Sequence, residues 1–95
     1  MLSLPAPERI VSGGYTGDLL SWVMGRAKQN NVWITIMTNV NIAAVAMLSD
    51  VSLVVLAEGV VPDEGVLETA REKGVNIVSS KLSAFDIAVG IAKDI

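Results

Sequence analysis

The sequence has no cysteine and no histidine among its 95 residues. It therefore has no disulfide, no thiolate ligand and no thiol nucleophile, and it lacks the side chain that most often serves as metal ligand or general base. Its longest apolar run is seven residues (42–48), whereas a membrane-spanning helix needs roughly 20. These absences predict a soluble, cytoplasmic protein that is not an enzyme and that uses no metal, cofactor or membrane.

Charged residues are also scarce. They make up 18% of the chain, against roughly 25% in an average soluble domain, and the net charge is −3. This acidic balance argues against nucleic acid as a partner. Hydrophobic residues, in contrast, make up 52% of the sequence. We expect a single domain over residues 1–95 to leave part of this apolar surface exposed, which favours a homodimer.

Short apolar runs separated by Gly, Pro, Asn and Asp indicate strands alternating with helices. The predicted strands are residues 9–12, 32–37, 52–56 and 75–79. The predicted helices are residues 18–28, 41–48 and 63–73, and a fourth that begins at Ser83. Asp18 and Ser83 are the expected N-caps of the first and last helix. The pattern predicts a three-layer α/β/α fold with a mainly parallel sheet of about four strands and helices on both faces.

The helix predicted at residues 42–48 is apolar all round, so more than one of its sides should be buried. A four-stranded sheet offers it only one surface. We therefore expect the dimer interface to use this helix or the helix at residues 18–28.

The loops that follow parallel strands meet at one edge of the sheet, where open α/β folds place their ligands. Lys81, between serines at the start of the last helix, is a candidate anion site. The glycine-rich loop at residues 12–17 is a weaker candidate for a nucleotide. Glu58 is a lone carboxylate at a strand end and ranks last, as a catalytic base. The candidate ligand-binding residues are Gly13, Gly14, Thr38, Asn39, Asn41, Glu58, Ser80, Lys81 and Ser83.

Five short stretches of the chain resemble the stand-alone form of the DRTGG domain, and the resemblance as a whole covers about residues 9–92. They are residues 12–21, 33–36, 41–46, 57–59 and 80–85. The sequence departs from that family's signature at two places. Met37-Thr38-Asn39 stands where many members have Gly-Asp-Arg, and Ala57-Glu58-Gly59 stands where they have Thr-Gly-Gly.

The resemblance implies an α/β domain similar to the N-terminal domain of HPr kinase/phosphorylase and to the first domain of Mur ligases. Such domains accompany CBS-domain pairs or phosphotransacetylase-like domains, or stand alone among the hydrogenase and electron-transfer proteins of anaerobes. Together with the composition, this leads us to expect a non-catalytic regulatory or accessory module that acts through homo-oligomerisation and protein interaction. The alternative is a sensor domain that binds a small anionic metabolite or a nucleotide.

Overall fold

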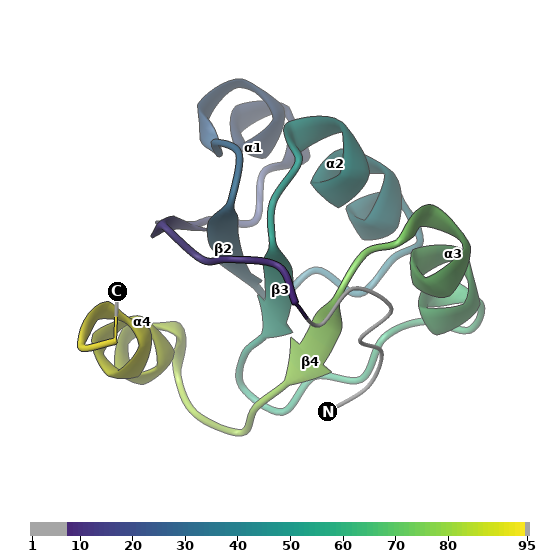
Figure 1. Ribbon diagram of the computed structural model, residues 1–95. Coiled ribbons are helices and arrows are strands. Elements are labelled where there is room, and N and C mark those ends of the chain that lie inside the picture. The colour runs from purple at the N-terminus through teal and green to yellow at the C-terminus, as the bar shows by residue number, and fades with distance from the viewer. Residues whose placement is uncertain (1–7, 95) are drawn as a thin grey trace.

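The computed structural model describes residues 8–94, in which strands and helices alternate along the chain (Figure 1). In chain order the elements are β1 (Gly13–Thr16), α1 (Leu20–Arg26), β2 (Asn31–Thr35), α2 (Asn41–Ser49), β3 (Leu53–Leu56), α3 (Val66–Lys73), β4 (Ile77–Ser79) and α4 (Ala84–Ala92). Within residues 8–94, no helix has the length and apolar character needed to cross a membrane.

The four strands form one parallel sheet in the order β1-β2-β3-β4. Each right-handed crossover between neighbouring strands places its helix on the same side of a sheet, so α1, α2 and α3 all cover one face. The helix α4 follows the last strand and crosses to the opposite face, where it packs on β1 and β2 (Figure 1). The predicted three-layer α/β/α fold with a parallel four-stranded sheet is confirmed.

The larger core lies between the sheet and α1–α3. Trp33, Leu56 and Ile77 point into it from the strands and are fully buried. The helix α2 contacts α1 on one side and α3 on the other, which explains why it is apolar all round. Neighbouring helices of the same chain, rather than a partner, bury four of its residues. These are Ile42, Ala43, Val45 and Ala46.

A smaller core lies on the opposite face, under α4. Val32 and Ile34 of β2 and Val55 of β3 point to this side and form one buried cluster with Ile87 of α4. Strands β2 and β3 are therefore apolar on both faces, as is typical of a parallel sheet covered on both sides. One helix covers this face, whereas three helices cover the other.

The first strand is shifted from its predicted place. The prediction at residues 9–12 is wrong, because β1 is formed by Gly13–Thr16, inside the stretch expected to be a glycine-rich loop. A Cβ atom on Gly13 would lie 3.0 Å from Asn31 Nδ2, and one on Gly14 would lie 3.2 Å from Val32 Cγ1. The two glycines thus let β1 approach β2 closely.

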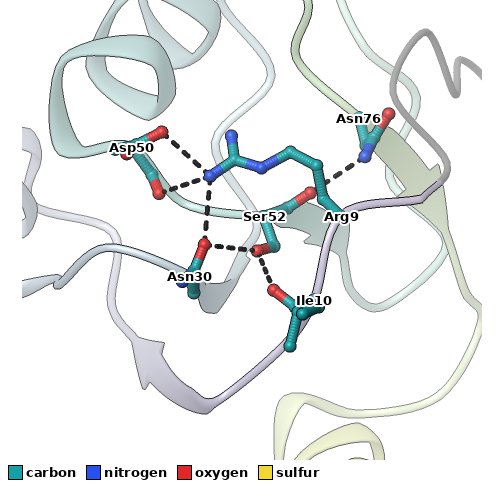
Figure 2. A network of polar contacts seen from close by, with 6 residues as sticks. All are labelled: Arg9, Ile10, Asn30, Asp50, Ser52 and Asn76. Atoms are coloured by element: carbon teal, nitrogen blue, oxygen red, sulfur yellow. Dashed lines mark hydrogen bonds and ion pairs between the residues drawn. The ribbon is translucent and has the colours of Figure 1, made fainter.

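Residues 9–12 instead run along the amino-terminal ends of the strands and are held there by a polar network (Figure 2). Arg9 Nη2 donates to Asp50 Oδ1 at 2.9 Å and to the Asp50 carbonyl at 3.0 Å. Ser52 Oγ donates to the carbonyl of Ile10, and Asn76 Nδ2 donates to the carbonyl of Ser52 at 3.0 Å. The amide of Ser12 also donates to the carbonyl of Asn30 at 2.9 Å, so side-chain contacts and one backbone hydrogen bond hold a segment that is not a strand.

Candidate functional site

The carboxyl-terminal edge of the sheet contains most of the residues predicted as ligand-binding. Thr38 and Asn39 lie in the loop after β2, and Asn41 is the first residue of α2. Glu58 lies in the loop after β3. The other three follow β4 and precede or cap α4: Ser80, Lys81 and Ser83. Gly13 and Gly14 are not part of this edge, because they form the first half of β1.

Backbone hydrogen bonds join these loops to one another. The amide of Asp63 donates to the carbonyl of Thr38 at 2.7 Å, which connects the loops after β2 and β3. The amides of Glu58 and Gly59 donate to the carbonyls of Leu82 and Ser80, at 2.9 and 2.8 Å. Glu58 and Gly59 both have positive φ, 61° and 69°, which turns the chain toward the β4–α4 loop. The edge is therefore a bonded set of loops.

Three of the candidate side chains accept hydrogen bonds from nearby backbone amides. Asn39 Oδ1 accepts from the amide of Asn41 at 2.9 Å. Ser80 Oγ accepts from the amide of Leu82 at 3.1 Å. Ser83 Oγ accepts from the amide of Asp86 at 3.2 Å, so the predicted N-cap of the last helix is confirmed. These contacts give the side chains a role in shaping turns and the helix start.

Asp18 has a different role from the predicted one. The N-cap of α1 is Leu19, with no capping hydrogen bond from its side chain, so the prediction that Asp18 caps this helix is wrong. Asp18 Oδ1 instead accepts from Thr35 Oγ1 at 2.7 Å and from the amide of Ile36 at 2.9 Å. The carboxylate thus fastens the loop after β1 to the end of β2. No local sequence signal reveals this contact between residues 17 positions apart.

A hollow of about 310 Å³ opens beside the loop after β3. Its lining includes three carboxylates, from Asp63, Glu64 and Glu68. A concave surface of this charge repels an anion. Lys81 is exposed and is not among the residues that line this hollow. The predicted binding of a small anionic ligand at this edge therefore stays a prediction, and the nearby concavity does not favour it.

The opposite layer carries an apolar surface that the sequence did not predict. We call it the α4 surface, and it consists of the outward side chains of α4 and the preceding loop with the hollow beside them. Leu82, Phe85 and Val89 are 55%, 76% and 42% exposed. The hollow measures about 200 Å³. Its lining comes from β1, β2 and α4: Gly14, Thr16, Val32, Ile34, Ala88, Ile91 and Ala92.

Comparisons of the chain with protein-family models, with curated proteins and with solved structures find no match. The resemblance to the DRTGG domain therefore rests on the residues of the sequence, and it stays a prediction.

Proposed function

We propose that this protein is a non-catalytic interaction module that assembles with itself. The observation that carries this proposal is the α4 surface, where large apolar side chains lie exposed beside an apolar hollow. Fully burying a side chain such as Phe or Leu contributes about 1.5–3 kcal/mol. Contiguous apolar patches on soluble proteins commonly mark protein interfaces.

The layering of the fold explains why apolar side chains are exposed on this side. Three helices cover one face of the sheet, and α4 alone covers the other. A single helix of nine residues, Ala84–Ala92, spans only part of a four-stranded sheet. Beside α4 this leaves a hollow over β1 and β2, whose floor residues Val32 and Ile34 are each only 2% exposed.

The chemistry of the chain supports a binding role over a catalytic one. Without histidine and cysteine, the best available base is a carboxylate, and Glu58 is exposed in a loop. Efficient general bases are usually tuned by burial or by charged neighbours. The resemblance to the DRTGG domain supports the same class, because such domains serve as accessory modules.

Light scattering coupled to size exclusion tests the proposal directly. At tens of micromolar we expect a mass of about twice the 10.0 kDa of one chain, falling toward one chain on dilution. A mass of one chain at every concentration up to the millimolar range would refute the proposed self-assembly.

A further inference from the structure

Phe85 and the hollow lie toward opposite ends of the same helix. Phe85 is in the first turn of α4 and is 76% exposed. The hollow is beside the last turns of α4, where Ala88, Ile91 and Ala92 line it. A twofold axis perpendicular to α4 at its middle places the first turn of one copy beside the last turn of the other. An antiparallel pair of α4 helices therefore brings each Phe85 toward the hollow of the other copy.

We propose that two copies of this chain pair through α4 in antiparallel orientation, with Phe85 of each copy seated in the hollow of the other. This inference rests on the proposed self-assembly and names its surface. The sizes agree, because an apolar cavity of about 150 Å³ accommodates benzene, and the hollow measures about 200 Å³. The lining is largely apolar, which suits an aromatic ring.

Small residues allow a second helix to come close to α4. Ala88 and Ala92 lie one turn apart on the side toward the hollow. Packed helices lie 8–10 Å apart, and small contact residues favour the shorter distance. The middle of α4 is therefore shaped for helix packing.

The charges on α4 are complementary under the same twofold axis. Asp86 lies in the first turn and Lys93 directly follows the last turn, and both are exposed. They are seven residues apart, which is two helical turns, so they share one flank. Antiparallel pairing brings Asp86 of each copy toward Lys93 of the other. It also sets the two helix dipoles side by side in opposite directions, which is favourable.

A stable dimer must bury more area than Phe85 alone offers, so the interface must include the whole α4 surface. Stable interfaces bury about 800 Å² per partner, which is about 15% of the 5344 Å² exposed by one chain. Phe85 contributes roughly 150 Å² of this area. Leu82, Val89 and the rim of the hollow extend the contact on both sides of it.

The other face also exposes apolar side chains, among them Leu19, Trp22 and Met24 at α1. On α1, the guanidinium of Arg26 lies 4.1 Å from the ring centroid of Trp22 and covers part of it. On α2, only Met47 and Leu48 at the carboxyl-terminal end are exposed among the large apolar residues of the helix.

Truncation of Phe85 is the first test. Phe85→Ala removes an exposed ring, so it should weaken dimerisation by at least tenfold and leave the thermal unfolding of the monomer little changed. The matched control is Val61→Ala, which truncates a side chain that is 78% exposed in the loop after β3. We expect it to leave the dimer unchanged. Equal effects of the two variants on the dissociation constant would overturn the proposal.

Charge reversal tests the antiparallel orientation. Asp86→Lys and Lys93→Asp each set like charges against each other at two symmetric places, so each should weaken the dimer severalfold. The double variant restores opposite charges and should recover most of the original affinity. Circular dichroism establishes that each variant keeps its fold. A double variant as weak as the worse single variant contradicts the antiparallel pairing.

A single introduced cysteine reports the interface without interference, because the chain has none of its own. Val89→Cys lies near the proposed axis and should form a disulfide-linked dimer under mild oxidation. Leu48→Cys, 64% exposed at the end of α2, is the matched control and should stay monomeric in denaturing gels. Cross-linking through Leu48→Cys alone would refute the α4 interface while the proposed self-assembly stands. A wild-type chain that is always monomeric refutes both.

Discussion

Two serines near the end of α2 should have opposite effects on stability when each is replaced by alanine. Ser49 is the last residue of α2, and among residues 8–94 its Oγ is the buried side-chain polar atom for which no hydrogen-bond partner is found. Ser52 is 2% exposed, and its Oγ donates to the carbonyl of Ile10, which holds the segment of residues 9–12 in place (Figure 2). The two side chains differ in hydrogen bonding and not in chemistry.

The magnitudes follow from the cost of burying a hydroxyl. An unpaired buried hydroxyl costs about 1–3 kcal/mol, and alanine is also the better helix former, by a few tenths of a kcal/mol. We therefore expect Ser49→Ala to stabilise the fold by about 1–2 kcal/mol. Ser52→Ala removes a bond and releases the segment it anchors, so it should destabilise by about 1–2 kcal/mol.

Urea unfolding followed by circular dichroism measures both effects, with the two single variants and the wild type compared at equal protein concentration. For a domain of this size, 1 kcal/mol corresponds to a shift in Tm of about 4–8 °C, so thermal scans must show shifts of opposite sign. If Ser49→Ala lowers the stability by more than about 0.5 kcal/mol, its hydroxyl is satisfied in solution and the reasoning from its burial is refuted.

Three further predictions concern the backbone, the amino-terminal anchor and the core. Gly25→Ala should stabilise the fold by about 0.5–1 kcal/mol, because a Cβ atom there meets nothing within 4 Å. Gly74→Ala should instead destabilise the fold by about 1–2 kcal/mol, because Gly74 has a φ of +70°. Differential scanning calorimetry distinguishes the two effects. A double-mutant cycle with Arg9→Ala and Asp50→Ala should give a coupling of about 0.2–1 kcal/mol that falls with added salt, and a salt-independent value would contradict an ionic contact. Val45→Asp should unfold the chain and not merely dissociate a dimer, because Val45 lies in the core and is only 9% exposed. A variant that circular dichroism shows to be a folded monomer would contradict this expectation.

Most of the regular elements could be predicted from the apolar pattern. Strand β2 was expected at residues 32–37 and is Asn31–Thr35, and helix α2 was expected at residues 41–48 and is Asn41–Ser49. Runs of branched residues bounded by Gly, Asn or Asp carry this information locally. The first strand was missed because glycine disfavours strands in general, and only the close approach of β1 to β2 explains its presence at Gly13 and Gly14.

The contacts that decide the candidate site were less predictable. The cap at Ser83 was found because its partner, the amide of Asp86, is three residues away. The bond from Thr35 to Asp18 joins the last residue of β2 to the loop after β1, so it depends on the tertiary fold. The α4 surface was also missed, because the interface was expected on the helices at residues 18–28 or 42–48. Its exposure follows from the sheet order, which directs the three crossover helices to the other face.

The strand order has a consequence for the synthesis of the chain. Each strand pairs with the one made just before it, so the sheet and its three crossover helices can assemble in the order in which they leave the ribosome. The apolar side of β2 and β3 has no cover until α4 emerges, and α4 follows all four strands along the chain. Val32, Ile34 and Val55 therefore stay uncovered on that side until after all four strands have been made. A nascent chain stalled before Ala84 should bind chaperones strongly and lose that binding once Ala92 has emerged.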